Sequence, residues 1–430
     1  MKTPLSALLT GTTISGVGTA MTVLSIPWYV LHTTGSAAQT GLVGAAEVAG
    51  LIVSSALGGP LVDRIQPRLV SIGSDLLAAI MVGLVPLLAA ANALPLPALV
   101  VLVMVQGLTR SPGGTAVDAL LPSAAKLART SISRASSLLE GAGRTGRLLG
   151  GASAGVLIAL LGPAEVLYVD AASYLASALL TAAFIHVRLD QDEPQPWSVR
   201  GHIAELRDGL RHLKAERLLA AVVLMVMATN TLDGAYGSVL LPSFGNQVLH
   251  SSVLLGLMVG TSSAGSLCGI VFYGTFGGRL PTWITYAVAF LLAGAPRLIT
   301  MATEPPLTVL LTVMAVTSFA FGMINPILLS QLFTRVPESM RGRVFGVVAA
   351  GAQVGMPLGA LAGGAAVQFA GLTTALLVTA GLYLTVTLCP FVFRVWRRLD
   401  EPLPVSAKDR KGESSGDHVL PKRPELATWG

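Results

Sequence analysis

The sequence predicts an all-α membrane protein whose twelve transmembrane helices form two pseudo-symmetric six-helix bundles. Three observations lead to this fold class. The 430 residues are 53% hydrophobic and only 12% charged, whereas a soluble protein has about 25% charged residues. Apolar runs of about 20 residues, the length that crosses a bilayer, recur along the chain. A sequence repeat relates the first half of the chain to the second.

The apolar runs predict twelve membrane spans. Each run is expected to be a helix, because backbone amide and carbonyl groups in lipid need partners within their own segment. Gly and Pro occur inside these runs, as is usual for transmembrane helices. The expected spans are 8–31, 37–60, 69–90, 96–118, 138–161, 165–188, 217–241, 252–276, 281–301, 306–328, 343–366 and 371–394.

Basic residues predict the orientation of the spans. Arg and Lys are concentrated in every second connection, where they include Arg64, Arg68, Lys126, Arg129 and Arg335. The positive-inside rule places such connections in the cytoplasm. Both termini are therefore expected in the cytoplasm, and the chain is expected to lie in the cell (inner) membrane. The remaining connections contain no Lys or Arg: 32–36, 91–95, 162–164, 242–251, 302–305 and 367–370.

The long polar connection in the middle of the chain predicts the domain organisation. An N-terminal six-helix bundle is expected over 1–188, a cytoplasmic linker over 189–216, a C-terminal bundle over 217–394 and a disordered cytoplasmic tail over 395–430. The linker is expected to form an amphipathic helix on the membrane surface, because apolar residues recur there at helical spacing among basic ones. These apolar residues are Ile203, Leu206, Leu210 and Leu213.

A weak internal repeat supports the two-bundle arrangement. The stretch 134–156 aligns with 343–365, both rich in Gly. Many transporters are built from such repeats, with a central site that opens alternately to each side of the membrane. The aligned pairs are Arg134 with Arg343, Gly146 with Gly355, Gly150 with Gly359 and Gly155 with Gly364.

The short polar stretch "GGPLVDRIQP" (58–67) lies between the second and third spans. Together with the next residue it contains a frame of Gly59, Asp63, Arg64 and Arg68. This frame resembles the signature loop of the major facilitator superfamily, although Gln66 and Pro67 replace the usual Gly and basic residue.

The resemblance implies that this loop is a cytoplasmic latch between the two halves. Asp63 would then cap the start of the eleventh span near Arg343, because an anion is favourable at a helix N-terminus by about 0.3–1 kcal/mol. Arg68 would pair with Asp118 at the inner end of the fourth span. Such a latch would favour the outward-facing state.

Further stretches resemble one branch of that superfamily, the macrolide-efflux and enterobactin-exporter branch. The resemblance covers about residues 5–400 and implies export of small organic molecules without specifying the substrate. The stretches are "GGTAVDALLPSAA" (113–125), "ISRASSLLEGAGRTGRLLGG" (132–151), "LYVDAASYLASALL" (167–180), "ELRDGLRHL" (205–213) and "RVPESMRGRVFGV" (335–347).

Two carboxylates within the expected spans are candidates for coupling protons to transport. Glu47 lies near the middle of the second span, and Asp233 lies in the seventh span one helical turn from Asn230. A charge at this depth costs at least about 2.5–3.5 kcal/mol and usually faces a cavity or a partner. Two interpretations stay open: a proton-carrying, substrate-facing role, or hydrogen bonds that hold helices together.

Other charges in the spans are expected to form ion pairs. Asp75 and Arg110 lie at similar depths in the third and fourth spans, and a structural pair between them is the preferred interpretation. Glu140 and Arg144 are spaced i,i+4 in the favourable order. Arg297, in the outer half of the membrane, either binds an anionic group or faces the outer surface.

Several function classes are excluded by missing motifs. The sequence contains no phosphate-binding loop of an ATPase and no metal-binding spacing of His and Cys. No cofactor, metal or nucleic acid is therefore expected, and no catalytic constellation indicates an enzyme.

The expected function is proton-coupled efflux of amphipathic organic compounds by a secondary active transporter, with buried carboxylates favouring cations. The expected partners are a small-molecule substrate, protons and the lipid bilayer, and the expected oligomeric state is a monomer. A dedicated exporter of one natural product or siderophore, a lipid flippase and a non-transporting membrane receptor or scaffold remain as alternatives.

Overall fold

A computed structural model describes residues 4–186, 207–211, 213–337 and 340–401. The side chains of residues 56–60 and 63 lie outside this description. The described residues form helices and short connections and contain no β-strand.

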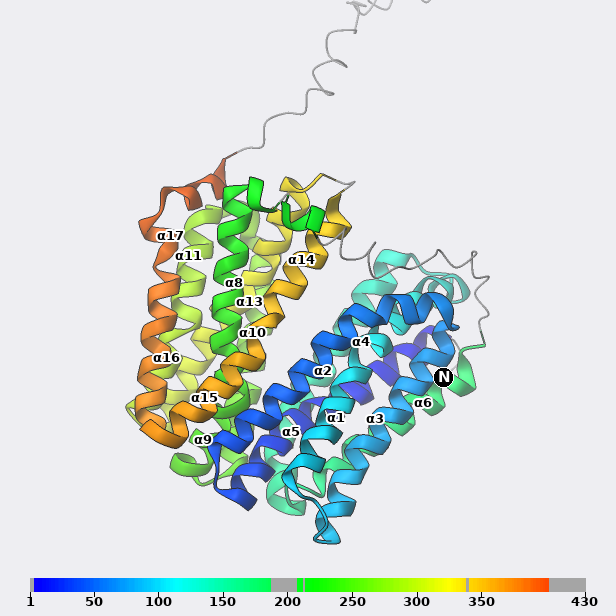
Figure 1. Ribbon diagram of the computed structural model, residues 1–430. Helices are drawn as coiled ribbons and strands as arrows, with labels where there is room; N and C mark the ends of the chain where they lie inside the picture. Colours follow the sequence, from blue (N-terminus) through cyan, green and yellow to red (C-terminus); the bar gives the residue numbers. More distant parts are fainter. Residues whose placement is uncertain (1–3, 187–206, 212, 338–339, 402–430) are drawn as a thin grey trace, which may run out of the picture.

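Six long helices make up the N-terminal half (Figure 1). Ser36 and Ser131 cap two of them by accepting hydrogen bonds from backbone amides, and Pro67 begins a third at a position where its missing N–H has no cost. The helices are α1 (Pro4–Thr34), α2 (Ala37–Arg64), α3 (Pro67–Ala90), α4 (Leu96–Leu127), α5 (Ile132–Leu161) and α6 (Val166–Phe184).

The C-terminal half is built from six further spans, several of which are interrupted. Pro296, Pro357 and Pro390 lie at three of the interruptions, because proline removes a backbone donor and clashes with the preceding turn. The spans are α8–η1–α9–η2 (Arg217–Ala235, Tyr236–Leu240, Leu241–Phe244, Gly245–Leu249), α10–η3 (Ser252–Phe276, Gly277–Arg279), α11–α12 (Thr282–Ala293, Ala295–Ala302), α13 (Leu307–Arg335), α14–α15 (Arg341–Val354, Met356–Ala370) and α16–α17 (Leu372–Thr387, Cys389–Val392).

The helix lengths and compositions are those of a multi-pass membrane protein. Among the described residues, eleven helical stretches are long and apolar enough to cross a membrane. Helix α5 is not one of them, because Glu140, Arg144 and Arg147 lie in its first half. It has 30 residues, and at about 1.5 Å per residue it exceeds the roughly 30 Å of the hydrocarbon core. With α5 included, the arrangement is the predicted one of twelve helices in two bundles.

The two ends of the molecule differ in their connections. At one end, here called the short-loop end, adjacent spans are joined by turns such as 35–36, 250–251 and 371. Gly35 and Gly371 have φ values of 65° and 81° there, a conformation that glycine adopts without strain. The opposite end, here called the basic end, carries the Lys- and Arg-rich connections.

The two halves pack against each other at the short-loop end and diverge toward the basic end (Figure 1). Helix α2 crosses α15, and α5 crosses α10. Glycines allow backbone to touch backbone at both crossings, where Gly41 faces Gly364 and Gly155 faces Gly256. The hydroxyl of Ser252 donates to the carbonyl of Gly155 at 2.9 Å.

The aligned glycines of the sequence repeat make equivalent contacts in the two halves. Gly150 lies against the backbone of α1, and its counterpart Gly359 lies against the backbone of α8. Gly155 and its counterpart Gly364 each touch a helix of the opposite half, α10 and α2. The sequence repeat therefore reflects equivalent close contacts between helices in the two halves.

The start of the predicted tail is ordered and packed. Residues Arg394–Asp400 form a 3₁₀ helix, η5, and do not belong to a disordered segment that begins at 395. The reason is the spacing of two apolar side chains, Trp396 and Leu399, which are 2% and 4% exposed and insert into the core of the C-terminal half. In the linker, Leu213 is buried in the same core, whereas Leu210 is 41% exposed. Ile203 and Leu206 lie outside the described residues.

We expect Gly155→Val to weaken the contact between the halves at the short-loop end. A Cβ atom at position 155 would lie 2.8 Å from the Cα of Gly256, and backbone atoms cannot rotate away. Fewer molecules should then be closed at this end. A cysteine introduced at Ser263, with Cys268 and Cys389 replaced by Ala, should react several-fold faster with a membrane-impermeant maleimide added from the short-loop side.

The matched control is Gly141→Val in the same helix. A Cβ atom at position 141 would meet nothing within 4 Å, so its labelling rate should equal that of the parent protein. Equal rates for Gly155→Val and the parent would contradict the proposed role of this contact.

Candidate functional site

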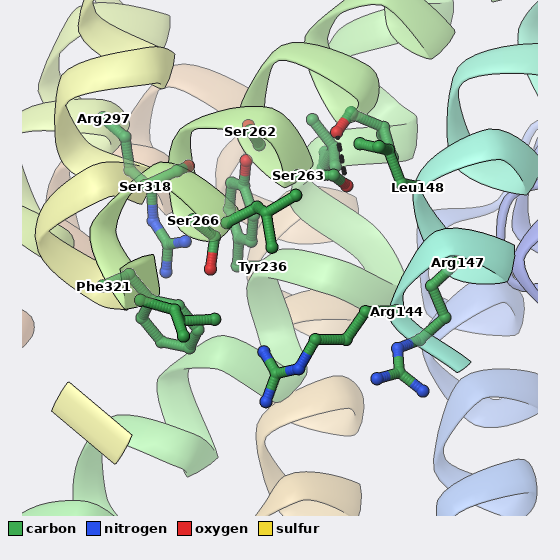
Figure 2. A pocket seen from close by; sticks show the side chains of 14 residues that line it. Arg144, Arg147, Leu148, Tyr236, Ser262, Ser263, Ser266, Arg297, Ser318 and Phe321 are labelled. Atoms are coloured by element: carbon green, nitrogen blue, oxygen red, sulfur yellow. Dashed lines mark hydrogen bonds between the residues drawn. The ribbon is translucent and has the colours of Figure 1, made fainter. Parts of the chain in front are cut away.

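A cavity of about 370 Å³ lies between the two halves. Figure 2 shows its wall, to which α5 contributes Arg144 and Arg147 and the C-terminal half contributes Tyr236 and Arg297. The lining residues include no Asp or Glu. Four hydroxyl groups complete the polar part of the wall: Ser262, Ser263, Ser266 and Ser318.

Two further cavities adjoin the first one, and each lies within one half. The N-half cavity measures about 570 Å³ and shares Arg147 with the cavity between the halves. The C-half cavity measures about 390 Å³ and shares Phe321 with it. The three cavities are therefore neighbours, and together they form the candidate substrate site.

The first intramembrane ion pair joins Glu47 of α2 to Arg110 of α4. The guanidinium Nη1 donates to the Glu47 Oε1 at 2.8 Å, and the Glu47 side chain is only 15% exposed. Gly107 brings the helices together, because its missing side chain leaves room for the Glu47 carbonyl. Arg110 follows one turn later and reaches the carboxylate.

The expected pair between Asp75 and Arg110 is therefore wrong. Both residues line the N-half cavity, but the close packing of α2 on α4 gives Arg110 a nearer carboxylate in Glu47. Depth along the helices, which suggested the Asp75 pairing, does not determine which side chains face each other.

The second intramembrane pair joins Asp233 of α8 to Arg297 of α12. Arg297 donates to the Asp233 carboxylate, and the two side chains are 11% and 18% exposed. The Arg297 guanidinium lies 4.0 Å from the ring centroid of Tyr236, a cation–π distance. The hydroxyl of Tyr383 donates to the Asp233 Oδ2 at 3.5 Å.

The interruption between α11 and α12 places Arg297 beside Asp233. At Gly294 the backbone leaves the helical conformation, and the ring of Tyr383 occupies the space that a side chain at position 294 would fill. Arg297 follows three residues later. The sequence left its role open, although an isolated Asp and an isolated Arg within one apolar half already favour mutual pairing.

Asn230 lines the C-half cavity together with Asp233, as their spacing of one turn predicts. Its amide Nδ2 donates to the backbone carbonyl of Ala352 at 2.8 Å. That bond joins α8 to α14 and gives the Asn230 side chain, a polar group of the cavity wall, a hydrogen-bond partner.

The pair between Glu140 and Arg144 is present, with 2.8 Å between Arg144 Nη2 and Glu140 Oε1. Both side chains are partly exposed, at 62% and 39%, because they lie at cavity walls. The next basic residue on this face, Arg147, has no hydrogen-bond or ion-pair partner among the described residues.

The predicted latch is described only in part. Gly59 and Asp63 lie in α2, but their side chains are outside the described residues. Arg68 does not pair with Asp118. Its Nη2 donates to the carbonyl of Ala182 at 2.7 Å, where the last turn of α6 leaves carbonyl groups without helical partners.

The remaining latch residues have other surroundings. Arg64 lies exposed in the last turn of α2, and Asp118 lines the N-half cavity. At the start of α14, Arg343 lies 3.6 Å from Asp208 of the linker. Asp208 of the linker therefore contacts Arg343, the residue near which the latch was expected to place Asp63.

No metal site accompanies these charges. Within the described residues, no group of three or more His, Cys, Asp or Glu side chains is arranged to hold a metal ion. The polar chemistry of the cavities thus rests on arginines, carboxylates, hydroxyls and the amides of Asn230 and Asn325.

Known proteins resemble this chain along most of its length. The family description of the Major Facilitator Superfamily matches residues 8–295 and 234–429. The multidrug efflux pump Tap of Mycolicibacterium fortuitum is 30% identical over 374 residues, which cover 86% of this chain and 90% of that protein. Tap of Mycobacterium tuberculosis (H37Rv) is 30% identical over 385 residues, covering 88% and 90%.

Solved structures share the fold. The nucleoside transporter NupG superposes with a TM-score of 0.74 and 17% identity, covering 91% of this chain and 99% of that chain. A bacterial homologue of the human lysosomal transporter Spinster, in an inward-facing and unoccupied conformation, gives a TM-score of 0.70 and 13% identity, covering 94% and 98%. At 17% and 13% identity, this similarity shows that the fold is shared. It does not indicate which substrate this chain binds.

We expect Asp233→Asn to lower the unfolding temperature more than the double change Asp233→Asn with Arg297→Gln. Removing one partner leaves the other charge buried, which costs about 3–5 kcal/mol, whereas removing both is often close to neutral. Glu47→Gln should compare in the same way with Glu47→Gln plus Arg110→Gln. Thermal unfolding of the purified protein in detergent, followed by tryptophan fluorescence, measures this order.

Glu140→Gln is the control for this series, because its pair with Arg144 is partly exposed and worth no more than about 1 kcal/mol. The prediction is contradicted if a double variant unfolds at the same temperature as its single variant or at a lower one. The unpaired charge would then not be the main cost of the single change.

Proposed function

The chain belongs to the major facilitator superfamily, and from this premise we propose that it is a secondary active transporter that exports amphipathic organic compounds in exchange for protons. The observation that carries the proposal is the pair of partly buried carboxylate–arginine contacts, one in each half, beside the cavities. Relatives named multidrug efflux pumps support the direction of transport.

The proposed coupling uses the two ion pairs as proton acceptors. A proton on Glu47 neutralises the carboxylate, and Arg110 loses the charge that compensates it. The same holds for Asp233 and Arg297. Because an unpaired charge in this environment is costly, protonation favours a rearrangement that gives the arginine a new partner or access to water.

The proposed alternation follows from the contacts between the halves. They touch at the short-loop end through α2, α15, α5 and α10, and the cavities lie in the space that widens toward the basic end. By the positive-inside rule, the proposal places the basic end in the cytoplasm, so that this conformation faces the cytoplasm. Export then requires the halves to close at the basic end, where the latch residues lie.

The cavity walls support substrates that carry an acidic group. Arg144, Arg147 and Arg297 line the cavity between the halves, and a carboxylate or phenolate would form charge-assisted hydrogen bonds with them. A preference for cations alone does not fit this wall. Asp75 and Asp118 line the adjoining N-half cavity and would accept a basic group of the same compound.

Besides the lipid flippase, two alternatives to broad drug export are tested by the compound panel below. A dedicated exporter of one natural product or siderophore would share the same cavities and pairs. A non-transporting receptor or scaffold needs neither the cavities nor the ion pairs. The presence of open cavities therefore disfavours this alternative.

We expect the chain to lower the accumulation of at least one compound in a bacterial host that lacks its own exporters. The panel contains macrolides, tetracyclines, dyes and siderophores. An uncoupler should restore accumulation, and Glu47→Gln or Asp233→Asn should reduce export at least tenfold, because the neutral side chain cannot exchange a proton. Membrane levels of each variant are measured in parallel.

The outcomes separate the alternatives. Export that persists with uncoupler would overturn proton coupling. Export of one siderophore or one natural product alone would favour a dedicated exporter. No export of any compound, with the protein present in the membrane, would favour the non-transporting alternative.

We expect Arg147→Gln to weaken binding of a fluorescent dye with a free carboxylate by at least tenfold and to leave its methyl ester unaffected. A hydrogen bond to a charged group contributes about 1.5–3 kcal/mol, which corresponds to this change. Fluorescence anisotropy on the purified protein with rhodamine 110 and its methyl ester, rhodamine 123, measures the difference. Arg279→Gln, outside the cavity linings, is the control, and equal effects on acid and ester would contradict the assignment.

A further inference from the structure

A second type of cavity lies on the C-terminal half, away from the transport cavities. It measures about 480 Å³, lies between α8, the α16–α17 span and η5, and shares no lining residue with the three transport cavities. Its wall is almost entirely apolar, with Leu224, Met225, Cys389 and Phe393 among the lining residues. Leu224 and Phe393 are 60% and 58% exposed on the described structure, as expected for side chains that face lipid.

A cationic cavity of about 450 Å³ adjoins this apolar one, and the two share Arg394 and Val395. Arg217 and Arg398 also line it, opposite a single acidic residue, Glu216. An apolar compartment and a cationic compartment therefore meet at Arg394, at the basic end of the membrane helices.

The arginines have different surroundings. Arg398 lies 3.9 Å from Glu401, in a pair that is at least half exposed. Arg217 and Arg394 have no ion-pair or hydrogen-bond partner among the described residues. Two cations at this site thus remain available for a ligand.

A well-packed element presents two of these arginines. In η5, the buried ring of Trp396 stacks on Tyr286 with ring centroids 5.9 Å apart. The Asp400 carboxylate accepts a hydrogen bond from the backbone N–H of Trp283 at 3.0 Å, and the Arg335 side chain donates to the Arg398 carbonyl. The site is therefore held in place before any ligand binds.

We propose that these two cavities together bind one anionic phospholipid, with the phosphate at Arg217 and Arg394 and an acyl chain in the apolar cavity. Basic pockets at the cytoplasmic ends of transmembrane helices bind anionic head groups in this way. A free phosphate would satisfy the arginines but would leave the apolar compartment without a role. The lipid is the occupant that uses both compartments.

The proposed lipid would connect the first and last spans of the C-terminal half. Helix α8 carries Asn230 and Asp233, and α16 carries Tyr383, which donates to Asp233. Anionic lipid should therefore stabilise this half and the ion pair within it. This proposal is independent of the transported compound.

The test uses the purified full chain in detergent and measures binding by native mass spectrometry and by the shift in unfolding temperature. The ligands are phosphatidylglycerol, phosphatidylcholine and glycerol 3-phosphate. We expect phosphatidylglycerol to bind at least tenfold more tightly than the other two. The double change Arg217→Gln with Arg394→Gln should abolish this preference.

Two further variants keep the test decisive. Arg279→Gln, at the same end of the same half but outside both cavities, should bind phosphatidylglycerol like the parent protein. Ala228→Phe, which fills the apolar cavity, should weaken the binding of phosphatidylglycerol and leave the binding of glycerol 3-phosphate unchanged. Unchanged lipid affinity in the double Arg variant would overturn the site, and equal affinity for glycerol 3-phosphate and phosphatidylglycerol would reassign it to a free phosphate.

Discussion

The cost of an unpaired charge within the bilayer is the constraint on which the rest of this structure depends. Glu47 and Asp233 lie deep in apolar helices, and each is compensated by an arginine from another helix of its own half. These contacts join α2 to α4 and α8 to α12, so in the proposed alternation each pair of helices would stay together when the halves move. They also define where a proton has the largest effect, because neutralising one partner removes the compensation of the other.

Glycine contacts form the frame that holds these pairs. Gly107 lets α4 approach α2 closely enough for Arg110 to reach Glu47, and Gly294 gives Tyr383 room beside Asp233. On two other helices, α5 and α15, Gly155 and Gly364 join the two halves. Packing within each half and contact between the halves thus use the same device, since helices without side chains at the crossing can approach by van der Waals contact of their backbones.

The sequence allowed prediction of the spans, the two bundles and the repeat, because apolar length and glycine spacing are properties of single segments. It did not allow prediction of the partner of Arg110, because depth along a helix says nothing of the direction in which a side chain points. The interruption at Gly294 turns Arg297 inward; Pro296 marks an interruption of the helix there, but it does not specify the direction in which the Arg297 side chain points. The prediction of a disordered tail from residue 395 was wrong for its first residues, because Trp396 and Leu399 insert into the core of the C-terminal half.

The two ion pairs are not equivalent under the pseudo-symmetry of the fold, and in the proposed mechanism this difference would give them different parts in transport. The counterpart of the α2–α4 crossing is the α10–α13 crossing, where Gly322 faces Ser266 and not a carboxylate. Helix α2 carries Glu47 in its middle, touches α15 at the short-loop end and ends in the latch loop at the basic end. A change of charge at Glu47 therefore acts on a helix that contacts the opposite half at the short-loop end and ends at the basic end. Asp233, held among Arg297, Tyr236 and Tyr383 beside the cavity between the halves, is placed instead to respond to what that cavity holds.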